Sequence, residues 1–295
     1  MLAGKSRVFI GLGGNFAQAT PDSTRTVEAL NNCDLTVQIS TKLNRSHLTH
    51  GAHALILPCF GRTDIDIQSE GPQAVTVEDS FSMVHASNGQ LQPLSRQMRS
   101  EPAIIAGIAA ATLGTQPVDW LWLTADYSRI RDLIADTIPG FKDFNERLKN
   151  PGGFYLGNAA SKRRWNTPTA RANFKANVLP LDLVHENVRS TGQTPDLIMQ
   201  SMRSHDQYNT TIYGLDDRYR GVKGQRDVLF VNEADIIRLG FKPGQKADLV
   251  SIWDDGRERR VKGFTLLAFD IPAGQAAAYY PEVNPLVPLE SVGDG

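Results

Sequence analysis

The 295 residues carry 31 Lys and Arg side chains against 32 Asp and Glu side chains, for a formal net charge of −1. This balance provides no overall basic field, so we expect neither nucleic acid nor a membrane surface as a partner. Hydrophobic residues make up 41% and charged residues 21%, which is typical of a globular protein and excludes a disordered or coiled-coil chain. At roughly 150 residues per domain, the length predicts two compact units.

The sequence also restricts location and thiol chemistry. The longest apolar stretch, residues 104–113, is far shorter than the roughly 20 residues that a membrane helix needs. The start lacks the apolar core of a signal peptide, so we expect either a cytoplasmic protein or a chain whose true beginning is missing. Cys33 and Cys59 are the two cysteines, which excludes a disulfide framework and a four-thiolate metal site, and we expect buried thiols.

The first half of the chain alternates apolar runs with helical patterns. We expect strands at 7–12, 35–40 and 54–57, a helix at 22–32, a hairpin at 74–77 and 81–85, and helices at 100–114, 119–122, 127–136 and 141–149. This order predicts an α/β fold, with residues 1–150 forming a doubly wound, Rossmann-like parallel sheet. Ligands of such sheets bind in the loops at the carboxyl ends of the strands.

The second half of the chain has a different residue composition. Residues 151–194 are rich in Asn, Pro and basic side chains and read as a connector with a short strand at 172–175. We expect a β-barrel in residues 195–295, from strands at 197–202, 228–231, 247–252 and 260–267, one helix at 232–240 and a proline-framed loop at 278–288.

A glycine loop follows the first expected strand. Gly13, Gly14 and Asn15 lie between a strand and a helix, where bare backbone N–H groups can approach a phosphate or a nucleotide sugar. The third glycine of a G-x-G-x-x-G motif would fall at Phe16, and no acidic residue ends the next strand, so an NAD site is disfavoured. A purely structural tight turn is the alternative.

A second polar loop, residues 40–47, follows the next strand. Its hydroxyl, ammonium, amide and guanidinium groups can surround a purine, a ribose or a pyrophosphate, with Lys42 or Arg45 as the charge partner. The alternative is a loop solvated by water. His47, His50 and His53 repeat every three residues without a neighbouring thiolate or acidic pair, so we expect no metal site.

Segment 202–222 is the most unusual part of the chain, because almost every side chain in it can form hydrogen bonds. Its charged members include Arg203, Arg218, Arg220, Asp216 and Asp217. The arginines can bind a pyrophosphate, or the aspartates can neutralise them in a structural loop. Near the end of the chain, Tyr279, Tyr280 and Asn284 favour equally a base-reading loop and ordinary packing.

Taken in order, segments 8–15, 40–47, 55–58, 203–210 and 279–284 closely resemble the molybdopterin oxidoreductases, and the nearest match is the branch similar to the formate dehydrogenase alpha subunit. Segments 165–174 and 231–240 share this resemblance, which therefore spans essentially all of the chain. Each motif alone is weak evidence for the family, whereas their combination in this order is specific to it.

The resemblance implies an α/β domain followed by a double-psi β-barrel domain, with two molybdopterin guanine dinucleotides holding molybdenum. It implies cofactor-binding roles for Gly13, Gly14, Asn15, Thr41, Lys42 and Asn44 in the first domain, and for Arg203, His205, Gln207, Asn209, Thr210 and Asn284 on the barrel side. It assigns neither a catalytic residue nor a metal ligand to this chain.

The sequence departs from the family pattern at both ends. A complete member has a preceding region with iron-sulfur ligation, and family barrels continue through a final strand. We therefore expect a C-terminal fragment that is inactive alone and self-associates, while the complete enzyme binds a small-molecule substrate and an electron-transfer partner. The alternative is a stand-alone, non-catalytic protein that binds a nucleotide or pterin cofactor.

Overall fold

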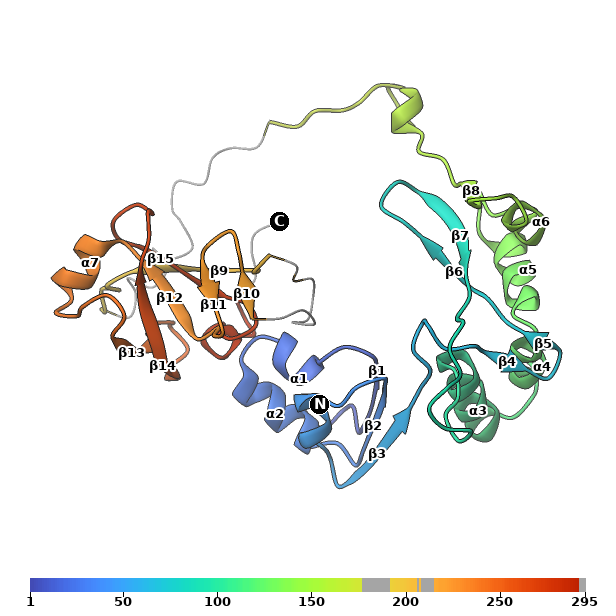
Figure 1. Cartoon of the computed structure of the whole chain (residues 1–295), viewed down its shortest axis with the longest axis horizontal. Coiled ribbons are helices and arrows are strands. Elements are labelled where there is room, and N and C mark those ends of the chain that lie inside the picture. Colours follow the sequence, from blue (N-terminus) through green and yellow to red (C-terminus); the bar gives the residue numbers. More distant parts are fainter. Residues whose placement is uncertain (177–191, 206, 208–214, 292–295) are drawn as a thin grey trace. The chain divides into compact units, whose positions relative to one another are not determined.

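A computed structural model describes residues 1–176, 192–205, 207 and 215–291 (Figure 1). Contacts between residues divide the chain into two compact units. The first unit comprises residues 1–38, 43–56 and 179–295, and the second comprises residues 39–42 and 57–178. The N-terminal segment thus groups with the C-terminal residues, and the expected domain limits at 150 and 194 stay a prediction.

The N-terminal part of the first unit is a small sheet with short helices. Its elements are β1 (Val8–Leu12), α1 (Phe16–Ala19), α2 (Ser23–Asn31), β2 (Leu35–Ser40), the 3-10 helix η1 (Arg45–Leu48) and β3 (His53–Pro58). The strands form a parallel sheet in the order β1-β2-β3, and the last residues of β2 and β3 are grouped with the second unit. The expected strands and the expected helix are confirmed here.

Helix α2 is explained by its N-terminal cap and by its apolar face. The Asp22 carboxylate accepts a hydrogen bond from the backbone N–H of Arg25 and so caps the first turn. Thr26, Ala29 and Leu30 are buried, and their spacing of three and four residues places them on one face of the helix.

The C-terminal part of the first unit is built on a curled, mixed five-stranded sheet in the order β13-β14-β12-β15-β9. Its elements are β9 (Ile198–Met202), β12 (Val228–Val231), α7 (Glu233–Arg238), β13 (Lys246–Ser251), β14 (Arg259–Ala268), β15 (Gln275–Tyr279) and the 3-10 helix η4 (Asn284–Leu286). A separate two-stranded ladder pairs β10 (Asp216–Asp217) with β11 (Val222–Lys223). All four residues of the central strand β12 are buried, as its uninterrupted apolar run predicts.

The second unit contains two small antiparallel sheets and a run of helices. Its elements are β4 (Ile67–Gln68), β5 (Gly71–Pro72), β6 (Val75–Glu78), β7 (Met83–Ser87), α3 (Glu101–Leu113), α4 (Trp120–Ala125), α5 (Ser128–Thr137), α6 (Phe144–Leu148), β8 (Phe154–Tyr155) and the 3-10 helix η2 (Ala160–Lys162). The antiparallel pairing of β6 with β7 confirms the expected hairpin, and β8 joins it as a third strand. Val84, Phe144 and Phe154 form its buried core.

Two expectations about local structure are wrong. Residues 172–175 form no strand, and the proline-framed loop begins later than expected, because Ala278 and Tyr279 belong to β15. The three consecutive alanines of β15 have low strand propensity, and pairing with β12 and β9 overrides it. Cys33 and Cys59 are buried free thiols, as expected.

In the described residues, we find no helix with both the length and the apolar character that crossing a membrane requires. The architecture is mixed α/β.

Candidate functional site

The glycine loop after β1 has a backbone that only glycine adopts readily. Gly13 and Gly14 have φ angles of 64° and 67°, in the left-handed region. Apart from each glycine and its two chain neighbours, no heavy atom of the described residues lies within 4 Å of the position that a Cβ would occupy on either glycine. The backbone conformation therefore favours glycine at both positions, and open space lies beside them.

The structure joins this loop to the polar loop after β2. The Asn44 side-chain amide donates a hydrogen bond to the Gly14 carbonyl at 2.6 Å, and the Ser46 hydroxyl donates to Asn15 Oδ1 at 3.2 Å. Ser46 is buried, and its oxygen also accepts from the backbone N–H of Ala17 at 3.0 Å. Asn44 in turn caps η1 through the backbone N–H of Ser46. Three expected binding residues, Gly14, Asn15 and Asn44, thus form one hydrogen-bonded cluster.

Thr41 and Lys42 are grouped with the second unit, whereas the cluster belongs to the first. Both residues are exposed, and the Ser40 hydroxyl donates a hydrogen bond to the Lys42 carbonyl at 2.7 Å, which shapes the turn.

Asn284 fastens the N-terminal segment to the five-stranded sheet. Its side-chain amide donates to the carbonyls of Gln18 and Ala19, both at 2.9 Å, and its own carbonyl accepts from the backbone N–H of Asp22 at 2.9 Å. Asn284 is 4% exposed. The Asn284 side-chain amide therefore holds α1 against the C-terminal part of the unit. Because α1 directly follows the glycine loop, this contact also fixes one end of that loop.

The other three described candidates on the barrel side, Arg203, His205 and Gln207, have different surroundings. The Arg203 guanidinium lies 5.9 Å from the centre of the Tyr280 ring, within reach of a cation–π interaction. Burial raises the pKa of Tyr280, and the charge of Arg203 acts in the opposite direction. His205 Nε2 lies 2.9 Å from an Arg218 nitrogen. Gln207 is buried, and Asn209 and Thr210 lie outside the described residues.

An ion pair between buried Arg226 and partly buried Glu282, which the sequence analysis missed, holds Gln207 in place. Arg226 pairs with Glu282 at 2.7 Å, and the same guanidinium donates to Gln207 Oε1 at 2.9 Å and to Ser204 Oγ at 2.7 Å. Gln207 also donates to the Tyr280 carbonyl. Arg226 and Glu282 are 56 residues apart in the chain, and no local pattern in the sequence indicates their contact.

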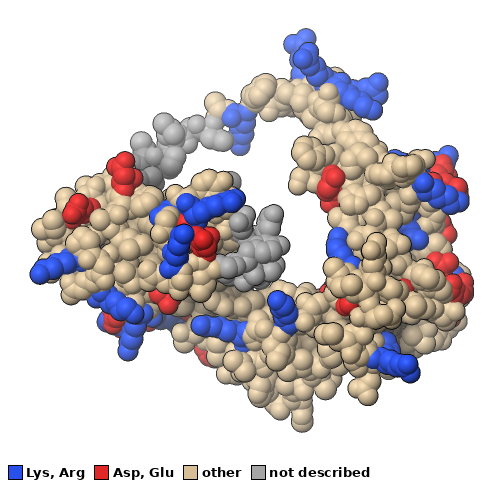
Figure 2. Space-filling view, in the orientation of Figure 1, with Lys and Arg blue, Asp and Glu red and all other residues tan. Residues whose placement is uncertain are grey.

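Asp217 neutralises one arginine of the polar segment, which is the structural alternative considered for that segment. Its Oδ2 accepts from Arg220 at 2.7 Å and from the Tyr279 hydroxyl at 2.8 Å, whereas its buried Oδ1 has no partner among the described residues. Burial raises the pKa of the Asp217 carboxyl, but the hydrogen bonds from Arg220 and Tyr279 outweigh it and leave the pKa below its usual range. Figure 2 shows this mixture of basic and acidic side chains over β10 and β11.

Within 1–176, 192–205, 207 and 215–291, no group of three or more His, Cys, Asp or Glu side chains is placed to hold a metal ion. His47 makes a structural contact, because its Nδ1 accepts from the backbone N–H of Asn44 at 3.0 Å. The site described here consists of hydrogen-bond donors, open backbone and a few cations, which can bind a polar or anionic ligand.

Comparison with known proteins identifies relatives that are longer than this chain. No family model matches the chain. Over 98% of its length, the chain is 53% identical to the uncharacterized oxidoreductase Rv2900c of Mycobacterium tuberculosis. The chain is homologous to part of a larger protein. It is also 45% identical, over 98% of its length, to protein YdeP of Escherichia coli. The chain spans 37% of the length of the mycobacterial relative and 38% of the length of YdeP.

Proposed function

We propose that this chain is the cofactor-holding portion of a molybdenum-dependent oxidoreductase of the formate dehydrogenase type. The observation that carries the proposal is homology over 98% of the chain to a mycobacterial protein whose name gives it as an oxidoreductase. That name favours a redox enzyme over a non-catalytic carrier. In this proposal the N-terminal sheet belongs to a doubly wound domain and the five-stranded sheet to a double-psi β-barrel.

The cluster around Gly14 has the chemistry that a guanine dinucleotide requires. The open space beside Gly13 and Gly14 can accept a bulky ligand at the backbone, and successive N–H groups in left-handed turns attract anionic oxygens. Asn44 fixes the loop through the Gly14 carbonyl. In this arrangement the backbone contacts the pyrophosphate, and Asn15 offers a polar group to the nucleoside.

On the barrel side, Arg203 supplies positive charge for the ligand. Gln207, which is held by Arg226, stabilises the segment that carries Arg203. Asn284 fixes α1, so that the glycine loop and the barrel side keep a constant distance. When bound, the molybdenum cofactor supplies two-electron redox chemistry, and this chain orients it and adjusts its electrostatic environment. The iron-sulfur cluster, the substrate site and the contact with the electron acceptor belong to other parts of the enzyme.

Equilibrium dialysis with GDP tests the nucleotide site, because GDP carries both the guanine and the pyrophosphate of the cofactor. We expect the 295-residue chain to bind GDP saturably and ADP more weakly, and we expect Gly14→Val to abolish binding, because a side chain would occupy the open space. Gly107→Ala, in the middle of α3, is the matched control and leaves binding unchanged. Equal binding of GDP by Gly14→Val and by the unchanged chain would overturn the site.

A further inference from the structure

A stretch of the second unit contains charged side chains of one sign only. The sequence has no acidic residue between Glu146 and Asp182, although the chain as a whole has a formal net charge of −1. Five basic side chains of this stretch are exposed, namely Lys162, Arg163, Arg164, Arg171 and Lys175. These five residues define the basic segment, and Figure 2 shows Lys and Arg side chains gathered where the chain carries η2.

The five cations are left without an internal partner. Among the described residues, no ion pair or side-chain hydrogen bond joins any of them to another residue. Lys149, by contrast, pairs with Glu146 at 2.7 Å. The chain has more acidic than basic side chains and still does not neutralise this segment, so its charge is available to another molecule.

The backbone presents these cations in defined turns. Arg163 and Ala170 have left-handed φ angles of 53° and 51°, which are unfavourable for residues with a side chain. The Thr167 hydroxyl donates a hydrogen bond to the Arg171 carbonyl at 2.8 Å and closes the second of these turns. Strained residues of this kind are concentrated at functional sites, so the two turns favour a binding role for the segment.

Phe174 adds an apolar group next to the positive charges. Its side chain is 96% exposed, and Lys175 follows it directly in the sequence. Aromatic residues and arginine are enriched where proteins bind one another. A partner that fits this surface has carboxylates for the cations and an apolar side chain for Phe174.

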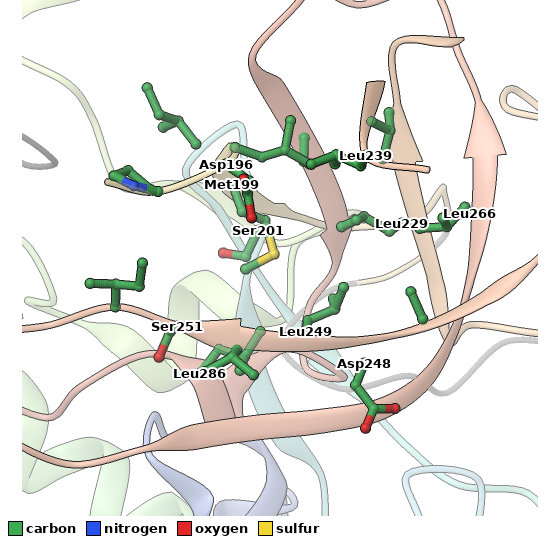
Figure 3. A pocket seen from close by; sticks show the side chains of 18 of the residues that line it. Asp196, Met199, Ser201, Leu229, Leu239, Asp248, Leu249, Ser251, Leu266 and Leu286 are labelled. Carbon is green, nitrogen blue, oxygen red and sulfur yellow. The ribbon is translucent and has the colours of Figure 1, made fainter. Parts of the chain in front are cut away.

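The cavity of the five-stranded sheet does not suit such a partner. It has a volume of about 710 Å³ and mainly aliphatic walls, with Asp196 and Asp248 at its border (Figure 3). Its described lining contains no Lys or Arg. The two carboxylates repel an acidic ligand, so the basic segment is the better site for one.

We propose that the basic segment docks an acidic polypeptide segment of another protein, one that also has an apolar side chain. The carboxylates of this partner pair with Arg163, Arg164 and Arg171. Its apolar side chain packs on Phe174. A nucleic acid fits less well, because the rest of the chain is net acidic and repels a long phosphate backbone. The inference does not depend on the proposed cofactor.

Fluorescence polarisation with the 295-residue chain tests this docking surface. The probe is a labelled peptide that repeats Glu-Glu-Leu over about 12 residues, roughly 40 Å when extended, and the matched peptide repeats Gln-Gln-Leu. We expect saturable binding of the acidic peptide only. Arg163→Gln combined with Arg164→Gln should weaken that binding at least about fivefold, and Phe174→Ser should weaken it independently.

Lys242→Gln combined with Lys262→Gln is the matched control, because it removes the same charge from two exposed lysines of the first unit. Circular dichroism shows whether each variant folds, and Arg171→Gln combined with Lys175→Gln replaces the first pair if that pair does not fold. The inference is overturned if the acidic peptide does not bind, or if both double variants bind it equally. It is also overturned if an oligothymidylate of equal length binds more tightly than the peptide. Displacement of the peptide by GDP would overturn it as well, because the segment would then belong to the nucleotide site.

Discussion

Asp22 and Arg259 form a buried ion pair that joins the N-terminus of α2 to the start of β14. The Arg259 Nε and Asp22 Oδ2 atoms are 2.9 Å apart, across 237 residues of sequence, and both side chains are 4% exposed. Arg259 also binds Asp255 at 2.5 Å, and Asp22 caps α2. One guanidinium therefore links the cap of α2 to β14 of the five-stranded sheet.

Replacing that guanidinium tests its role in stability. Arg259→Met leaves the Asp22 carboxylate buried without its partner, and we expect a loss of about 3–5 kcal/mol in the free energy of unfolding. Urea denaturation followed by circular dichroism measures it. Arg260→Met, one residue away and paired with Glu258 at the surface, is the control and should change stability little. Equal effects of the two substitutions would contradict the buried pair.

The contact between Asp255 and Arg259 makes the stability of the fold depend on pH. The hydrogen bond from Arg259 lowers the pKa of Asp255 to about 2, against an ordinary value of 3.8, while partial burial acts in the opposite direction. Because the folded pKa is the lower one, this group stabilises the fold fully above about pH 4 and loses its contribution as the pH falls towards 2.

We therefore expect Asp255→Asn to flatten the decline of unfolding free energy between pH 4 and pH 2. Asp270→Asn, at an exposed aspartate of the same unit, serves as the control. Urea denaturation at a series of pH values provides the measurement. If Asp255→Asn leaves the slope unchanged while Asp270→Asn alters it, the contact with Arg259 does not control acid stability.

Two glycine substitutions should have opposite signs. Gly14 has a left-handed backbone, so Gly14→Ala should destabilise the chain by about 1 to 2 kcal/mol. Gly107 lies inside α3 with open space around it, so Gly107→Ala should stabilise by about 0.5 to 1 kcal/mol. Thermal unfolding of both variants checks the prediction, and stabilisation by Gly14→Ala would contradict the loop conformation.

The outer face of β1 predicts self-association. Val8, Ile10 and Leu12 are 54%, 45% and 51% exposed, and their period-two spacing places them on one face of the strand. We expect the sedimentation coefficient of the chain to rise with concentration, and Ile10→Lys to suppress that rise. Leu94→Lys, which charges an exposed leucine of the second unit, should not suppress it. A monodisperse monomer at high concentration would refute this prediction.

Local patterns in the sequence predict much of this fold. Ser100 as a cap and Gly114 as a terminator bound α3 as expected, because each acts through neighbouring backbone groups. Strand β15 is missed, because its alanines are tolerated only between β12 and β9, where Ala278 is fully buried. That interaction is not visible in a local window of sequence.

The candidate site shows the same limit. Gly13, Gly14 and Asn15 are conspicuous as a loop after a strand, and that setting is confirmed. The contact of Asn44 with Gly14 and the pair of Arg226 with Glu282 join distant segments, so they become visible only in the folded chain. The polar character of a loop is therefore predictable from sequence. The residues with which its side chains form hydrogen bonds are not.

The guanine nucleotide content of the purified chain tests the cofactor proposal most directly. Acid hydrolysis releases GMP from a molybdopterin guanine dinucleotide, and chromatography quantifies it. We predict that the 295-residue chain, purified from a host that makes this cofactor, releases GMP, and that the Gly14→Val chain releases much less. Release of no GMP by the unchanged chain, or of equal amounts by both chains, would contradict a guanine dinucleotide site at the glycine loop.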